Sequence, residues 1–545
     1  MNRFSIGASR AGRIVFLGGA LLVSSASHAV RFEIGEHITG SFDSTFTAGA
    51  AFRAEKPDDD LLYSRTNPQG QIGNAQFDKW DPVSASLKGT HELLLDFGQT
   101  YSAFVRGTWF YDEVNAKTLD RSDGLLDYGA AMNRARDHAD ILDAYVLARY
   151  SFAGRPLSLK LGQQVISWGE STFIGNSLNV INPVDVSKLR LAGAELKDGL
   201  VPVNAFYANY GVTPNIQLET FYLLDFEETL PDPAGVYWSS AWFLFDGGEE
   251  IRAAPRPGGG FIKLDRTADD HAEWNNQYGV ALRYYSYELD SEFSLYYMNL
   301  HSTALNIGAR STGPAPVPVA SRADPGATDL VVGEYFLTYA QNVDIAGVAF
   351  NTRLGSYAVS GEYSYRDNAP VQFGNFRDPS LGGTVPAGME IDTIGRLKIS
   401  QMQFTGQRIL GPRFGYDQLS VIGEVGFNYV HNRDRYDNDR YFDPFSDFSW
   451  GYQVRASATY NRALFNLVNL TPGLAYRQDV NGESSELGGA RTFREGRKQA
   501  SVSLGWDYKT NWFGEISYNW FWGARGDGNP FTDRDFIALS VSYQL

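Results

Sequence analysis

Residues 535–545 read DFIALSVSYQL, and this last stretch of the chain decides the fold. Its apolar side chains occupy every second position: Ile537, Leu539, Val541, Tyr543 and Leu545. Successive side chains of a β-strand point to opposite faces, so this alternation predicts a strand with one apolar and one polar face. Such a strand at the end of an exported chain is typical of the closing strand of a bacterial outer-membrane barrel.

The start of the chain has the features of a secretory signal peptide. Residues 1–13 contain three arginines and no acidic residue, and an apolar run follows from Ile14 to Val23. Ser27-His28-Ala29 then provides a small-x-small cleavage site. The alternative is a membrane-anchoring helix, which needs about 20 apolar residues, and this run is much shorter. We therefore predict that residues 1–29 are removed after Ala29 and that residues 30–545 form the outer-membrane barrel.

The composition of the mature chain fits this prediction. It has 516 residues (545 minus 29) and no cysteine, which excludes thiol nucleophiles and thiolate metal sites. Aromatic residues make up 14% of the chain, and the two interfacial girdles of a barrel would use them. The net charge of −16 becomes −19 without the three signal arginines, and phosphate recognition needs a basic surface. We expect no nucleic-acid partner.

Alternating segments recur along the mature chain. Clear cases are Val83 to Leu95, Tyr101 to Tyr111, Leu142 to Phe152, Tyr357 to Tyr365, Leu419 to Tyr429, Trp450 to Tyr460 and Ala500 to Tyr508. In the segment that starts at Trp450, aromatic residues lie at both ends of the apolar face and Arg455 lies on the polar face. This is the pattern of a strand that crosses lipid between two interfaces.

Short turns alternate with long connections throughout, as in barrels with short periplasmic turns and long outer loops. The predicted fold class is an all-β, transmembrane antiparallel β-barrel of about 18 strands, within a range of roughly 16 to 20. The count holds if Leu330 to Asn342 belongs to an outer loop, because a nineteenth strand would break the even number of bacterial single-chain barrels.

The long outer loops are expected to contain short helices that lie partly inside the lumen. One candidate is Asp120 to Leu142, a polar stretch with good helix formers. The other is Asn179 to Leu196, in which Asp185 or Ser187 would cap a short helix through Lys188 to Leu191. Such pieces could narrow or plug the lumen.

The most distinctive local sequence runs from Gly162 to Glu170. It is accompanied by Asn182-Pro183-Val184-Asp185, Ala194-Glu195-Leu196, Gly40 to Thr45, Gln401-Met402-Gln403 and Gly423-Glu424-Val425-Gly426. Together these features resemble the Gram-negative outer-membrane barrel family filed as domain of unknown function 1302, over nearly the whole mature chain. The resemblance implies transport of lipid-like or aromatic molecules. It also implies a periplasmic lipid-carrier protein and an inner-membrane exporter of hydrophobic compounds as partners.

Two explanations of the block from Trp168 to Asp185 remain open. In the first, Trp168 is an interface anchor and Pro183 belongs to a loop that starts a helix. In the second, the loop enters the lumen, and Trp168, Glu170 and Asp185 line a constriction. In the second explanation the loop must not contact lipid, because non-helical backbone at membrane depth is tolerated only when it is buried in protein or lines a cavity.

Ionised residues on the polar strand faces are expected to point into the lumen, because a charge that faces lipid costs several kcal/mol. The basic ones are Arg106, Arg149, Arg283, Arg366, Arg455 and Arg477, and the acidic ones are Glu92, Glu219, Glu362, Glu424, Asp507 and Glu515. From these we select Arg106, Arg149, Arg283, Arg455 and Glu424 as candidate pore-lining residues. Ion pairs that only fill the barrel are the alternative.

Three classes of function are compatible with the sequence: a transport barrel for small hydrophobic or amphipathic molecules, a general water-filled porin, and an outer-membrane enzyme or surface adhesin. Apolar loop segments such as Trp242-Phe243-Leu244-Phe245 favour the first. The seven histidines occur singly and no catalytic or metal-binding motif is present, so we expect no enzyme, cofactor or metal. The expected partners are outer-membrane lipid and lipopolysaccharide, the barrel-assembly machinery and a small-molecule solute.

Overall fold

The computed structural model describes residues 30–545, except 65–66, 69, 119–125, 127, 314–315, 322–325, 375–385, 438–440, 443, 488–490 and 525–528. The predicted signal peptide, its cleavage site and part of the helix expected between Asp120 and Leu142 lie outside the described residues. No helix in the described part is long and apolar enough to cross a membrane.

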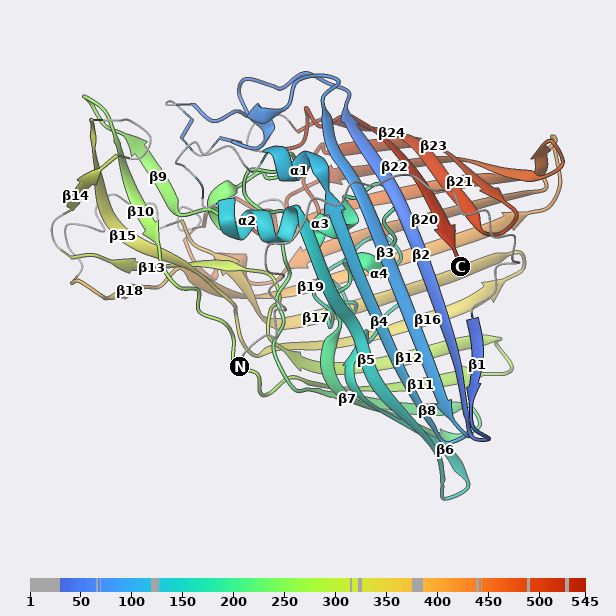
Figure 1. Ribbon diagram of the computed structural model, residues 1–545. Helices are drawn as coiled ribbons and strands as arrows, with labels where there is room; N and C mark the ends of the chain where they lie inside the picture. Colours follow the sequence, from blue (N-terminus) through green and yellow to red (C-terminus); the bar gives the residue numbers. More distant parts are fainter. Residues whose placement is uncertain are drawn as a thin grey trace.

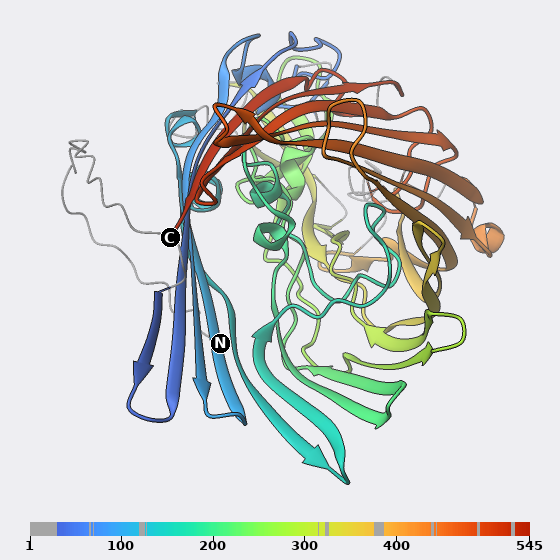
Figure 2. The same ribbon diagram turned by 90° about the vertical axis from the view of Figure 1, so that its right-hand side faces the viewer.

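Eighteen antiparallel strands form a closed barrel wall, which confirms the predicted fold class and strand number (Figures 1 and 2). In order around the barrel they are β2 (Ile38–Arg53), β3 (Pro82–Phe97), β4 (Tyr101–Asp112), β5 (Asp137–Phe152), β6 (Arg155–Gln164), β7 (Val203–Thr213), β8 (Ile216–Leu223), β11 (Tyr278–Ser286), β12 (Ser291–Leu300), β16 (Val343–Leu354), β17 (Tyr357–Gln372), β19 (Ile394–Leu410), β20 (Gln418–Val430), β21 (Phe448–Leu464), β22 (Val468–Asn481), β23 (Lys498–Tyr508), β24 (Trp512–Trp522) and β25 (Phe536–Gln544).

The terminal strand closes the wall, as its alternation predicted. β25 pairs with β2 from Thr45↔Gln544 to Arg53↔Phe536. The rest of this edge of β2 is covered by β1 (Val30–Ile34), a short strand that pairs from Val30↔Phe42 to Ile34↔Ile38. β1 therefore shields the part of β2 that β25 does not reach, and no edge of the first wall strand is left unpaired along these residues.

The two ends of the barrel differ in the length of their connections, as predicted. Figure 1 shows the long connections at the left and the short turns at the right. Six short strands in the long connections form a second sheet outside the wall. They are β9 (Glu250–Pro255), β10 (Phe261–Arg266), β13 (Asn306–Ser311), β14 (Val317–Ala320), β15 (Thr328–Thr338) and β18 (Glu390–Ile391).

Two expectations about the loops need correction. The stretch Leu330 to Asn342 lies outside the wall as expected, but most of it is strand β15, which pairs with β10, β13 and β14. Between Asp120 and Leu142, only α2 (Tyr128–Ala135) is helical among the described residues, because residues 137–142 already belong to β5. The predicted helix therefore extends too far, because residues 137–141 pair with β4.

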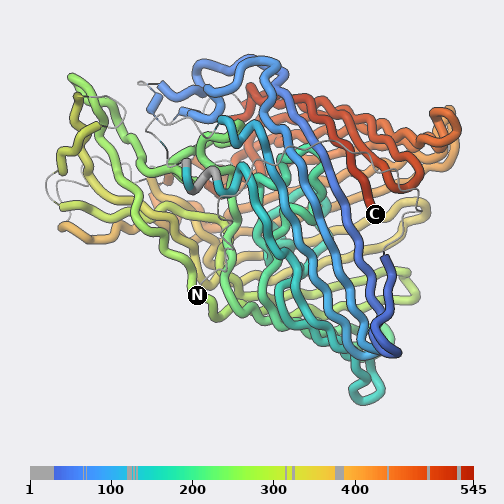
Figure 3. The backbone as a smooth tube through the Cα atoms, viewed as in Figure 1, coloured from blue at the N-terminus to red at the C-terminus, as the bar shows by residue number. Residues whose placement is uncertain are grey.

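Among the described residues, four short α-helices lie in the connections, whose paths Figure 3 traces. α1 (Glu113–Thr118) and α2 lie at the loop end of β3 to β5 (Figure 1). α3 (Val186–Leu189) and α4 (Leu196–Gly199) lie inside the ring of strands (Figure 2). Of the two expected caps of α3, Asp185 is the N-cap, since its Oδ1 accepts a hydrogen bond from the backbone N–H of Ser187 at 3.1 Å. The helix ends at Leu189 and does not reach Leu191 as expected.

Candidate functional site

The connection between β6 and β7, residues 165–202, runs through the inside of the barrel, and we call it the inserted segment. It leaves the wall at Gln164 and returns at Val203, and it contains α3 and α4. Gly169, with φ of 93°, turns the chain inward just after Trp168. Of the two explanations that the sequence left open for Trp168 to Asp185, this placement agrees with the one in which the loop enters the lumen.

Three wall carboxylates hold the first half of the inserted segment. Glu424 on β20 accepts hydrogen bonds from the backbone N–H groups of Thr172 (2.9 Å), Phe173 (2.7 Å) and Ile174 (2.6 Å). Glu362 on β17 accepts from the N–H groups of Glu170 and Leu178, the latter at 3.3 Å. A carboxylate that accepts several N–H bonds fixes irregular backbone that has no strand partner.

The third carboxylate is Glu219 on β8, which anchors a side chain instead of backbone. It accepts a hydrogen bond from Trp168 Nε1 at 2.8 Å and a second from Arg283 Nε at 2.8 Å. The Trp168 ring is 1% exposed and contacts the rings of Phe221 and Tyr296, with centroids 4.8 and 5.6 Å away. The indole therefore lies between the segment and the wall, where its N–H has a charged partner.

Amide and hydroxyl groups of the wall complete this attachment. Gln401 donates to the carbonyl of Gly175 at 2.7 Å, and Gln403 donates to the carbonyl of Ile174 at 3.2 Å. On the neighbouring strand, Arg366 donates to the carbonyl of Ser177 at 3.2 Å. Both glutamines belong to the Gln401-Met402-Gln403 motif that carried the family resemblance, so the motif binds the inserted backbone.

Glycines in the wall make room for the apolar side chains of the segment. A Cβ on Gly279 would lie 2.7 Å from the Trp168 ring, and one on Gly347 would lie 2.5 Å from the Leu178 side chain. A Cβ on Gly426 would lie 2.8 Å from Ile174 Cδ1. Any larger residue at these positions would push the segment off the wall.

The second half of the segment is held by charge. Lys88 on β3 forms an ion pair with Asp198 of α4. Lys188 of α3 lies 3.3 Å from Asp140 on β5 and 3.7 Å from Asp185. Two lysines from different sides thus fix α3 and α4 against β3 and β5.

The predicted site residues separate into two groups. Trp168, Glu170, Arg283 and Glu424 meet where the segment contacts β8, β11, β16 and β20. In this group Glu170 accepts a hydrogen bond from Asn351 Nδ2 at 3.0 Å, and burial raises the pKa of its carboxyl. Asp185 is 2% exposed and caps α3.

The other group lies along the wall. Arg106 pairs with Asp143 on the next strand, and Arg149 donates to Ser102 Oγ at 2.8 Å. Arg455 is exposed to the lumen and has no ion pair with a described residue. Glu219 and Glu362 were recognised only by their phase on polar strand faces, since the partners that give them a role are distant in sequence.

Two cavities adjoin the inserted segment. The lumen cavity, of about 810 Å³, lies between residues 186–195 and strands β21 to β25, and Arg455 and Glu515 line it. The outer cavity, of about 280 Å³, lies between the segment, the loop ends of β16 and β17, and the long connections. Arg190 borders both cavities, with its guanidinium 4.4 Å above the Trp238 ring and 5.2 Å from the Phe531 ring.

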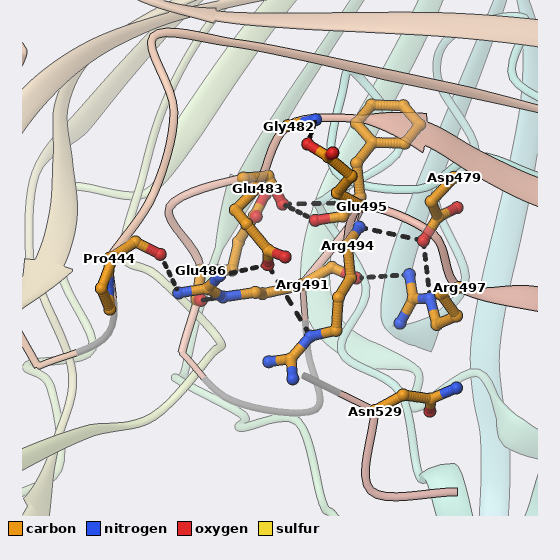
Figure 4. A network of polar contacts seen from close by, with 12 residues as sticks. Pro444, Asp479, Gly482, Glu483, Glu486, Arg491, Arg494, Glu495, Arg497 and Asn529 are labelled. Carbon is orange, nitrogen blue, oxygen red and sulfur yellow. Dashed lines mark hydrogen bonds and ion pairs between the residues drawn. The ribbon is translucent and has the colours of Figure 1, made fainter. Parts of the chain in front are cut away.

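The connection between β22 and β23 borders the outer cavity and is fixed by ion pairs (Figure 4). Arg497 Nε lies 2.6 Å from Asp479 Oδ2, and burial lowers the pKa of this arginine to about 10. Arg491 pairs with Glu483 and donates to the carbonyl of Pro444 at 2.9 Å. Glu486 of this connection therefore has a defined position at the cavity, where it accepts from Thr492 Oγ1 at 3.0 Å.

We expect Glu424→Gln to loosen the inserted segment. Three backbone N–H groups would then share one carbonyl oxygen and face an amide NH₂, and each buried donor left unpaired costs about 1–3 kcal/mol. Hydrogen exchange of a peptide that contains Thr172 to Ile174 should become faster, as measured by mass spectrometry. Glu515→Gln is the matched control, because Glu515 also lies on a wall strand and has no hydrogen bond to the described segment. Equal exchange in both variants would contradict the anchoring role.

The solved structures similar to this chain include OccAB3 of Acinetobacter baumannii, with 11% identity, a TM-score of 0.43, and coverage of 93% of this chain and 99% of that chain. OpdK of Pseudomonas aeruginosa has 9% identity and a TM-score of 0.41, with coverage of 93% and 98%. A BenF-like porin from Pseudomonas fluorescens Pf-5 has 10% identity and a TM-score of 0.42, with coverage of 93% and 98%. Among curated proteins none matches. The model of the family described as "Protein of unknown function (DUF1302)" matches residues 10–545, and the chain belongs to this family.

Proposed function

We propose that this protein is an outer-membrane channel that transports small hydrophobic or amphipathic molecules. The observation that carries the proposal is the inserted segment, which the wall fixes inside a closed barrel by Glu424, Glu362 and Glu219. It leaves a lumen cavity of mixed polar and apolar lining on one side and a mostly apolar outer cavity on the other. A segment held by so many specific contacts restricts passage and offers side chains to a solute.

The outer surface of the wall supports an outer-membrane location, and cleavage behind Ala29 is the export step that we propose with it. Its exposed side chains alternate with the lumen-facing ones and are apolar, as a lipid contact requires. Examples with their exposed fractions are Val146 (55%), Leu161 (49%), Leu295 (56%), Val348 (47%), Leu474 (60%) and Ile516 (48%). We propose that this surface contacts outer-membrane lipid and lipopolysaccharide, and that the barrel-assembly machinery inserts the protein. A periplasmic lipid carrier and an inner-membrane exporter are the partners that the family resemblance suggested.

Single-channel recording tests the proposal. The refolded mature protein in planar bilayers should show a small conductance, because the inserted segment occupies part of the lumen. Hydrophobic or amphipathic solutes should reduce the current while they occupy the outer cavity. A large conductance that such solutes leave unchanged would favour the general porin, and an absence of conductance would contradict transport. Membrane fractionation and N-terminal sequencing test the location and the cleavage.

A further inference from the structure

The outer cavity is lined by a half-buried arginine that has no ion pair with a described residue. Arg366 on β17 lines this cavity, and its Nη2 donates to the carbonyl of Ser177 at 3.2 Å. Its Nε is buried and has no hydrogen-bond partner. Among the described residues, no carboxylate oxygen lies within 4.0 Å of its guanidinium. A charged group that is partly removed from water costs free energy unless it is paired, so an anion in the cavity would stabilise this guanidinium.

The nearby carboxylates are already used by other groups. Glu362 accepts from the backbone of the inserted segment and from Gln403 Nε2 at 3.0 Å. Glu486 accepts from Thr492 Oγ1 at 3.0 Å and acts on Arg366 only through space. Asp232, the other acidic residue at the cavity, lies 3.2 Å from Arg190. Arg366 is therefore the cation at this cavity that is available to a ligand.

The rest of the cavity wall is mostly apolar. The apolar side chains come from the inserted segment, the long connections and the loop ends of β12, β16 and β19: Val180, Leu244, Phe245, Leu300, Val343 and Ile399. A mostly apolar cavity with a few placed polar groups is the usual form of a small-molecule site. Its volume of about 280 Å³ fits a small molecule and excludes a large lipid.

We propose that the outer cavity is a binding site for small amphipathic carboxylates. The carboxylate would bind the Arg366 guanidinium, whose planar donors match two carboxylate oxygens, and the hydrocarbon part would contact Leu300, Val343 and Ile399. This inference rests on the proposed function and names the substrate class of the same channel. Arg190, between the outer and lumen cavities, is then the next cation that the carboxylate meets on its way through the barrel.

A ligand series on the refolded mature protein in nanodiscs tests the site. Octanoate, octan-1-ol and octylammonium have the same chain and differ in the headgroup. Isothermal titration calorimetry should show octanoate binding at least tenfold more tightly than the alcohol, with no binding of the ammonium. Equal affinity for octanoate and octanol would overturn the inference, and this comparison needs no variant.

Substitution then locates the headgroup. Arg366→Gln keeps a donor for the Ser177 carbonyl but removes the charge, and it should lower the affinity for octanoate to that for octanol. Arg408→Gln is the matched control, because Arg408 also lies on a wall strand and donates to Tyr357 OH at 2.7 Å at the short-turn end. Unchanged octanoate binding by Arg366→Gln would overturn the site. Wild-type protein that conducts ions but does not prefer the carboxylate refutes this inference alone, whereas protein without conductance refutes the proposed channel.

Discussion

Deletion of residues 171–184 should raise the single-channel conductance several-fold while the barrel still assembles. This part of the inserted segment carries the contacts with Glu424, Glu362 and Gln401, and its residues Asn176 and Val180 line the outer cavity. The wall does not need these residues for its pairing, because β6 pairs directly with β5 on one side and with β7 on the other. Removing it leaves the sheet closed and widens the water-filled path. Recording in planar bilayers measures the effect, and heat-modifiable migration in gels measures assembly.

The control is a deletion in another loop, one that lies outside the lumen. Residues 256–260 form the turn between β9 and β10 in the outer sheet, far from the inserted segment along the chain. Shortening this turn should leave the conductance unchanged. If the deletion of residues 171–184 also leaves permeation unchanged in a normally assembled barrel, the inserted segment does not form the constriction, and its role is structural.

The wall was predictable because its signal is local. A strand with one face toward lipid and one toward the lumen has a period of two, and this period can be read within a single stretch such as Phe536–Gln544. The alternation of short turns and long connections fixed the number of strands. The same local chemistry predicted the cap of α3, because Asp185 and Ser187 are two residues apart.

The attachment of the inserted segment was not predictable in the same way. Glu424 and Thr172 are 252 residues apart in sequence, and Glu362 and Glu170 are 192 residues apart. Phase on the strand showed that both carboxylates face inward, but nothing local showed what they bind. Likewise, nothing in the neighbouring sequence explains why glycine occurs at positions 279, 347 and 426. The side chains of the inserted segment that pack against these glycines explain it.

The outer sheet was missed for a related reason. Its strands pair across separate connections, for example Ile262↔Leu330 between β10 and β15. Leu330 to Asn342 was assigned to an outer loop, and the apolar side chains of Val331 and Val332 in this stretch are buried in the second sheet. From its sequence alone, a short buried segment of this kind can be assigned either to a wall strand or to a loop, because its pairing partners are not known. The even strand number decided correctly that it lies outside the wall.

We expect Ala456→Arg to destabilise the barrel strongly. Ala456 lies at the middle of β21, on the same face as Val454, which is 40% exposed, and it pairs with Leu474, which is 60% exposed. This face contacts lipid in the proposed orientation. An arginine on the lipid face near the bilayer midplane costs about 2–4 kcal/mol. Urea unfolding of protein refolded into lipid vesicles should show a loss of this size.

Ser503→Arg is the matched control for this prediction. Ser503 lies at the middle of β23, lines the lumen, and has the outward-facing Val502 and Leu504 as neighbours, each 40% exposed. An arginine there enters a space inside the barrel that is already lined by Arg455 and Glu515. Its effect on the free energy of unfolding should be small. Similar losses in both variants would mean that the two faces of the wall do not differ, and the alternation on which the whole fold prediction rests would then lack its physical cause.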